Sequence, residues 1–334
     1  MASEPTPNKN GQPDLNDPGS RKKPRYLRWV GLFLTLSATA FLVLIFDWKA
    51  VGKIFQQSNG WKLTLFFLLH IWALLHLQQW RLWLFCGGRV KGRDTFAALC
   101  LGIFSNQFLP GGVGGDLGRV WELKRRSDLS LSEAFSVTLW FRVTGLAFLF
   151  GVALLWIPFA PKALDSEIWQ KVTWGPGRGI LFLFLGLGIA VVILGIPSLR
   201  KKITEFGITF RSMAAVLTPG QWIGICLLTF SFHFFRALAL DGYLAEAGWE
   251  EFSWVNWAIV LPLMAFFALL PLAIGGLGVI EGVITLVLVL LGVPEAIALY
   301  VALCNRIAVI LAALMGGAYY SFLGVNPPGK RISG

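Results

Sequence analysis

Long apolar stretches are the feature that most constrains how this chain can fold. Several contain at least about 18 predominantly apolar residues, which is enough for a helix to cross a hydrocarbon core of roughly 30 Å. Only 14% of the 334 residues are charged, whereas a soluble domain carries about 25%. The sequence therefore predicts an all-α polytopic membrane protein.

The apolar stretches separate into segments at 27–46, 63–84, 95–123, 133–157, 179–198, 220–245, 254–292 and 296–322. Two of these, 95–123 and 254–292, are interrupted by Pro and Gly, and each predicts a helix, a break and a second helix. We expect six transmembrane helices from the other segments and two re-entrant helical hairpins from the broken ones. Two complete crossings per hairpin would satisfy the same charge distribution.

The basic residues orient this arrangement. The net charge of +11 does not indicate nucleic-acid binding, because most Lys and Arg lie in the tails and in short loops between apolar stretches. Cytoplasmic loops carry an excess of these residues, which places both termini in the cytoplasm. We expect an uncleaved first helix and the loops at 81–93, 119–126 and 200–211 on the cytoplasmic side.

The domain organisation follows from composition. Residues 1–25 are polar and rich in Pro, Asn and Gly, which predicts a disordered cytoplasmic tail. Residues 26–325 form a single transmembrane domain, and 326–334 form a short cytoplasmic tail.

The two halves of this domain correspond in sequence. Leu-Pro at 109–110 and Gly-Gly at 114–115 align with Leu-Pro at 270–271 and Gly-Gly at 275–276. Glu-Ala at 133–134 and 295–296 follows, and then an intramembrane arginine, Arg142 or Arg306. Repeat A spans about 26–157 and repeat B about 179–322, each with three crossings, so the second copy is inverted. Inverted repeats with broken helices indicate a midplane site and alternating access.

The stretches NQFLPGGVGGDLGRVWELKRR, LPLAIGGLGVIEG and GVPEAIALYVALCNRI resemble the lysylphosphatidylglycerol synthase transmembrane-region family, a flippase-like family. Its relatives include the membrane half of the bacterial multiple peptide resistance factor. The resemblance implies lipid translocation, or handling of a polyprenyl-phosphate lipid carrier, in the bacterial cytoplasmic (inner) membrane. It does not imply aminoacyl transfer, because that chemistry resides in a separate soluble domain.

Buried charges supply the first candidate site. Arg142 lies roughly 13 Å into its span and Arg306 roughly 15 Å, from opposite sides, at 1.5 Å per residue. An arginine at that depth costs at least about 2.5 kcal/mol and faces the protein interior or a wet cavity. One interpretation is that both guanidinium groups receive a lipid phosphate, to which Arg offers bidentate geometry. The alternative is an internal ion pair, with Glu281 the natural partner.

The hairpin tips supply the second candidate site. Glycines let the backbone approach a ligand, and a helix that begins near Asp116 directs free N–H groups at an anionic headgroup. The alternative is that Asp116 caps the helix and the glycines permit tight packing. The candidate substrate-binding residues are Arg142, Arg306, Gly111, Gly112, Gly114, Gly115, Asp116, Arg119, Gly275, Gly276, Glu281, Asn305 and Arg236.

Other chemistries have little support in the sequence. The glycine spacing is not that of a dinucleotide site, no GK[ST] follows, and the three His and four Cys have no metal-ligand spacing. We therefore expect no cofactor and no catalytic residues. Two alternatives to a lipid translocase stay open: an intramembrane enzyme that uses Asp116, Glu122 or Glu281, and an accessory subunit that holds a lipid-modifying enzyme.

Overall fold

The computed structural model describes residues 48–108, 113–156, 207, 210–212, 214–269 and 275–323, and the elements in these ranges are helices. The all-α prediction is confirmed for this part of the chain. The predicted spans 27–46 and 179–198, both tails and most of the loop at 200–211 lie outside the described residues.

The long helices agree with four of the predicted spans. Gly60–Phe85, Leu131–Leu155, Pro219–Glu246 and Glu295–Ser321 are long and apolar enough to cross a membrane. Their ends lie within three residues of the spans predicted at 63–84, 133–157, 220–245 and 296–322. The first consists of α3 (Gly60–Trp72), the π-helical turn η1 (Ala73–Leu77) and α4 (Gln78–Phe85). The others are α7 (Leu131–Trp156), α11 (Pro219–Glu246) and α14 (Glu295–Leu323).

Local sequence explains where these helices begin. The Asn59 side chain accepts from the backbone N–H groups of Trp61 and Lys62 at the start of α3. Thr218 and Gln221 form a capping box at the start of α11, with Pro219 in the first turn. In a capping box, two side chains satisfy N–H groups that a helix start would otherwise leave without partners. The helix boundaries therefore follow directly from the sequence.

The two broken segments form helical hairpins. In the first, α5 (Gly92–Phe108) is followed by α6 (Val113–Arg126), and in the second, α12 (Trp257–Leu269) is followed by α13 (Val279–Leu290). The predicted pattern of helix, break and helix is confirmed in both, and the helices of each hairpin contact each other. Two short helices, α2 (Trp48–Gln57) and η3 (Trp254–Asn256), precede α3 and α12.

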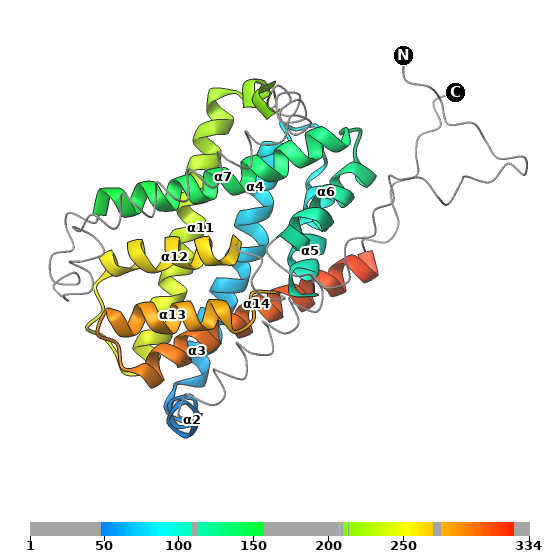
Figure 1. Cartoon of the computed structure of the whole chain (residues 1–334). Coiled ribbons are helices and arrows are strands. Elements are labelled where there is room, and N and C mark those ends of the chain that lie inside the picture. Colours follow the sequence, from blue (N-terminus) through cyan, green and yellow to red (C-terminus); the bar gives the residue numbers. More distant parts are fainter. Residues whose placement is uncertain are drawn as a thin grey trace, which may run out of the picture.

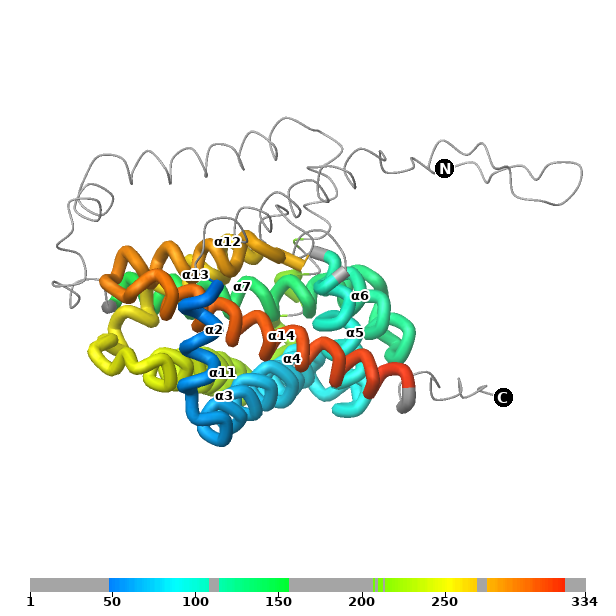
Figure 2. The backbone as a smooth tube through the Cα atoms, turned by 90° about the horizontal axis from the view of Figure 1, so that it is seen from below, coloured from blue at the N-terminus to red at the C-terminus, as the bar shows by residue number. Residues whose placement is uncertain are grey.

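The hairpins lie on opposite sides of the bundle. In Figure 1, α5 and α6 lie near one end of α14, and α12 and α13 lie near the other. α14 contacts both α5 and α13, and Figure 2 shows it running diagonally across the molecule between the hairpins. α11 and the helix from α3 to α4 lie together along the remaining face.

Apolar side chains occupy both the interior and the outer surface. The largest core cluster joins α11, α12, α13 and α14, and a second joins α4, α5, α6 and α7. On the outside, Leu154 is 72% exposed and Leu227 62% exposed. A soluble protein rarely exposes a contiguous apolar surface of this kind, so the outer surface is suited to contact with lipid.

Candidate functional site

A cluster of buried and partly buried arginines surrounds the start of α6. Arg142 on α7 places its Nε 2.5 Å from Asp116 Oδ2, and Arg119 on α6 donates from Nη1 to Asp116 Oδ1 at 3.2 Å. Three predicted candidates from two helices therefore meet here. Arg142 is in an ion pair, as one of the two interpretations of the sequence expected.

Arg81 on α4 is a further member that the sequence analysis missed. The sequence placed it at the cytoplasmic end of the span 63–84 and gave it no binding role, but Arg81 lies within α4 and is only 2% exposed. Its Nη1 donates to Gln78 Oε1 at 3.0 Å and its Nη2 donates to the carbonyl oxygen of Phe141. The π-helical turn η1 immediately precedes α4. Such turns occur often at functional sites.

Two glycines make room for these arginines. A Cβ at Gly145 would lie 3.2 Å from Arg81 Nη2, and a Cβ at Gly102 would lie 3.4 Å from Arg119 Nε. Both guanidinium groups also lie against the ring of Phe141, with Cζ 4.0 Å from the ring centroid for Arg81 and 4.7 Å for Arg119. The pattern of Arg142 followed three residues later by Gly145 was the available sequence signal for a partner side chain at this place.

The cluster carries more positive charge than the described residues balance. It contains Arg81, Arg119 and Arg142 but the single carboxylate of Asp116. In the described part of the chain, the Nε groups of Arg81 and Arg119 are buried and have no hydrogen-bond partner. The arginines also act on one another as like charges. Buried charges and donors are normally paired, so this arrangement favours an incoming anion.

At the second hairpin, by contrast, the buried positive charge is balanced by a carboxylate. Arg306 on α14 donates from Nε to Glu281 Oε1, and from Nη1 and Nη2 to the carbonyl oxygens of Gly275 and Gly276 at 3.0 Å each. The second oxygen of Glu281 accepts from the backbone N–H of Gly278 at 2.6 Å. Arg306 therefore binds the tip of the second hairpin to α14. The internal ion pair that the sequence offered as an alternative is present between Arg306 and Glu281, whereas Arg142 shares Asp116 with Arg119.

Glycines at the tips provide close packing. A Cβ at Gly115 would lie 2.5 Å from the carbonyl oxygen of Gly102, so α5 and α6 approach closely here. Gly275 has φ +60°, and a Cβ there would lie 3.0 Å from the carbonyl oxygen of Gln107 at the end of α5. The two hairpins therefore touch each other through Gly275. Gly114 is buried in the first turn of α6, and positions 111 and 112 lie outside the described residues.

Arg236 and Asn305 form a separate contact. Arg236 on α11 donates from Nη2 to Asn305 Oδ1 at 3.4 Å, and its Nε has no partner in the described ranges. Asp241, one turn further along α11, instead accepts from the indole N–H of Trp257 at 3.0 Å. Arg236 is thus a second under-paired cation, on the side of α14 next to Arg306.

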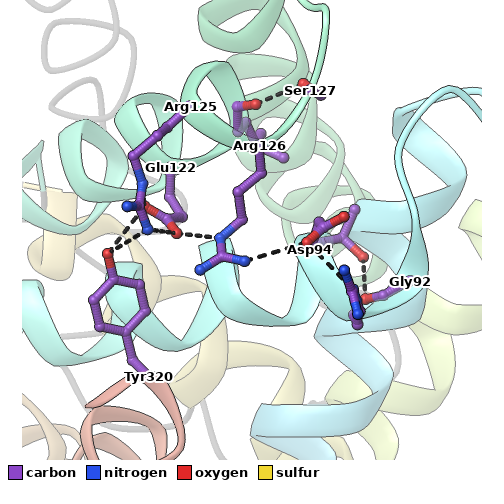
Figure 3. Close-up of polar contacts among 10 residues, drawn as sticks. Gly92, Asp94, Glu122, Arg125, Arg126, Ser127 and Tyr320 are labelled. Carbon is purple, nitrogen blue, oxygen red and sulfur yellow. Dashed lines mark hydrogen bonds and ion pairs between the residues drawn. The ribbon is translucent and has the colours of Figure 1, made fainter. Parts of the chain in front are cut away.

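A salt-bridge network fixes the far end of the first hairpin (Figure 3). The buried Glu122 accepts from Arg125 Nη2 at 2.7 Å, from Arg126 Nε, and from the Tyr320 hydroxyl at 3.1 Å. Arg126 also donates to Asp94 at 3.3 Å, so the network joins α6 to α5 and α14. Burial raises the pKa of the Glu122 carboxyl, but the hydrogen bonds and charges of the two arginines outweigh it and hold that pKa below its ordinary value. The charge partners of Glu122 are therefore Arg125 and Arg126 at the end of α6.

Metal chemistry finds no support in the described ranges, where no group of three His, Cys, Asp or Glu side chains could hold a metal ion. The four cysteines, all described, are free thiols.

The fold and the interior charges define the class: this is an integral, polytopic helical membrane protein, and its interior contains arginines whose donors the described residues pair only in part. A family model described as the lysylphosphatidylglycerol synthase TM region matches residues 28–317. The chain belongs to that family, which confirms the resemblance seen in its hairpin motifs. Neither the curated proteins nor the solved structures include one that matches the chain.

Proposed function

We propose that this protein is a lipid translocase that moves a phosphate-bearing anionic lipid between leaflets, and that Arg81, Arg119 and Arg142 receive the phosphate. The observation that carries the proposal is that, among the described residues, three buried or partly buried guanidinium groups surround one carboxylate, and the Nε donors of Arg81 and Arg119 have no partner there. A phosphate offers several acceptor oxygens, and Arg is the side chain best suited to bind it. The family's description names a phospholipid synthase, which agrees with a lipid as the cargo.

Asp116 has a defined part in this proposal. It occupies the position between Arg119 and Arg142 and partly compensates their charge when no lipid is bound. An entering phosphate competes with this carboxylate for the two arginines. Because the exchange replaces one anion by another, the arginines are never left fully unpaired in the low-dielectric interior.

The wider arrangement that we propose has six transmembrane helices and two re-entrant hairpins in an inverted repeat, with both termini on the cytoplasmic side of the inner membrane. The hairpins meet at Gly275, and the arginine cluster lies beside the first of them. The headgroup would pass between the hairpins while the hydrocarbon chains stay in contact with the bilayer. Either a phospholipid or a polyprenyl-phosphate lipid has the required phosphate.

We further propose that the protein acts without catalysing a reaction on the lipid. The carboxylates that an intramembrane enzyme would use are Asp116, Glu122 and Glu281, and each is bound by at least one arginine. A general base must be within reach of the proton that it abstracts, whereas these oxygens already accept hydrogen bonds that hold the helices together.

The test is a translocation assay in liposomes that contain headgroup-labelled phosphatidylglycerol and an impermeant quencher. We expect Arg81→Gln to slow the quenching of inner-leaflet label at least tenfold, because it removes one of the guanidinium groups that compensate the phosphate. Arg81→Lys keeps the charge but loses the bidentate geometry, so it should fall between the wild type and Arg81→Gln. Arg93→Gln is the matched control, since the Arg93 side chain is 62% exposed. Equal quenching in wild-type, Arg81→Gln and protein-free vesicles would refute the proposal.

A further inference from the structure

An apolar cavity of about 260 Å³ lies between α7, α11 and α12. Its lining includes Phe148, Val152, Phe230, Phe234, Trp257 and Leu261. Pockets that enclose a complete drug-sized ligand measure about 300–1,000 Å³. This cavity is therefore suited to one segment of a hydrocarbon chain and not to an entire lipid.

One polar side chain, His233, lines the cavity. His233 is only 7% exposed, and neither of its ring nitrogens has a hydrogen-bond partner among the described residues. Its ring stacks on Phe148 with centroids 5.7 Å apart and planes 6° apart. Aromatic packing alone requires no imidazole, because a Phe would stack equally well at this position. Each buried polar group without a partner calls for an explanation.

The cavity lies close to Arg81 of the arginine cluster. On α7, a Cβ at Gly145 would lie 3.2 Å from Arg81 Nη2, and Leu149, four residues later on the same helix face, lines the cavity. Arg81 and Arg236 are also close enough to His233 to act on it as positive charges. A lipid whose phosphate contacts the cluster can therefore extend a chain into the cavity, and His233 is then beside the junction of headgroup and chain.

We propose that this cavity binds one acyl chain of an ester-linked diacyl phospholipid, and that His233 donates a hydrogen bond to the ester carbonyl oxygen. The inference rests on the proposed function, and it selects between the two lipid classes left open there. A neutral imidazole carries one N–H donor. A diacyl lipid has a carbonyl acceptor between the phosphate and the chain, whereas a polyprenyl chain begins at the phosphate and offers none. A buried donor that has no partner among the described residues, placed at the junction, matches the first class.

The experiment compares two lipids with the same labelled phosphoglycerol headgroup and the same chain length, one with ester linkages and one with ether linkages, which lack the carbonyl. Both are reconstituted with the full-length protein, and quenching by an impermeant reagent is followed. One hydrogen bond changes an equilibrium by about threefold to tenfold. We expect the wild type to move the ester lipid faster by that factor. His233→Phe should move both lipids at one rate, and His233→Asn, which keeps a donor, should restore part of the preference.

The outcomes separate the two proposals. Translocation of both lipids at equal rates by the wild type, with loss of both in Arg81→Gln, would overturn the role of His233 and leave the lipid translocase standing. A preference that persists in His233→Phe would also overturn it. Failure of the wild type to move either lipid above protein-free vesicles would overturn both proposals.

A second variant tests the cavity without changing His233. Ala258 on α12 also lines the cavity, so Ala258→Phe fills space that the chain requires. We expect it to slow the lipid with long acyl chains about tenfold and to leave a short-chain analogue within twofold of the wild type. Leu154→Phe on the exposed surface of α7 is the control. Equal slowing of both chain lengths by Ala258→Phe would contradict the assignment of the cavity to a chain.

Discussion

The ion pair between Glu281 and Arg306 provides a direct test of the claim that the second hairpin is structural. Glu281 is 3% exposed and Arg306 9% exposed, and Arg306 also binds the carbonyl oxygens of Gly275 and Gly276. Glu281→Gln removes the carboxylate and leaves a buried guanidinium without its counter-charge. Breaking a buried pair from one side costs about 3–5 kcal/mol. We therefore expect the free energy of unfolding to fall by at least about 3 kcal/mol.

The double variant Glu281→Gln with Arg306→Gln separates charge from shape. Removing both charges avoids the uncompensated cation. The free energy of unfolding of the double variant should therefore be at least about 1 kcal/mol higher than that of Glu281→Gln alone. An amide at position 306 can still donate to one tip carbonyl. Because the proposed phosphate site is the cluster around Arg81, the double variant should retain lipid translocation.

The assay is unfolding in mixed micelles with increasing denaturing detergent, followed by the fluorescence of the 15 tryptophans. Glu295→Gln is the control, because Glu295 is an exposed residue in the first turn of α14 and its loss should cost less than about 1 kcal/mol. The reasoning fails if Glu281→Gln costs no more than this control. It fails equally if the double variant is well folded and yet moves no lipid.

Two further predictions concern the first hairpin. Gly115→Ala places a Cβ 2.5 Å from the backbone carbonyl oxygen of Gly102 and should lower the free energy of unfolding by about 1–3 kcal/mol. Gly151→Ala, whose Cβ meets nothing within 4 Å, is the control and should be neutral or stabilising by up to about 1 kcal/mol. Equal effects of the two variants in the same unfolding assay would contradict the tight contact between α5 and α6. Tyr320→Phe removes the hydroxyl bound to Glu122 and should lower the free energy of unfolding by about 1.5 kcal/mol. Tyr319→Phe is the control and should change that free energy by less than about 0.5 kcal/mol. A neutral Tyr320→Phe would show that the network does not hold α14 to the first hairpin.

The helices could be read from the sequence because one physical requirement determines them. A hydrocarbon core demands a fixed length of apolar helix, and the ends of α7, of α11, of α14 and of the helix from α3 to α4 fall within three residues of the predicted limits. The breaks were also predictable, since Pro and Gly interrupt the apolar pattern of both hairpin segments. These features depend on local sequence alone.

The site was only partly predictable, because its chemistry depends on long-range contacts. The depth of Arg142 along its helix indicated a position facing the interior, and the structure brings it together with two further candidates, Asp116 and Arg119. Arg81 was missed because its contacts lie on another helix: it donates to the carbonyl oxygen of Phe141, and Gly145 makes room for its guanidinium. Pseudo-symmetry likewise suggested that Arg306 matches Arg142, but Arg306 binds Glu281 and two backbone carbonyl oxygens of the second hairpin, whereas Arg142 shares Asp116 with Arg119.

The most direct test of the central claim is the position of the lipid phosphate in an experimental structure of the protein with ester-linked phosphatidylglycerol in nanodiscs. The account predicts a phosphate within hydrogen-bond distance of Arg81 and Arg119, with Asp116 displaced from at least one of its arginines and Arg306 still bound to Glu281. A phosphate bound at Arg306 with the arginine cluster unchanged, or lipid confined to the outer surface of the bundle, would contradict it.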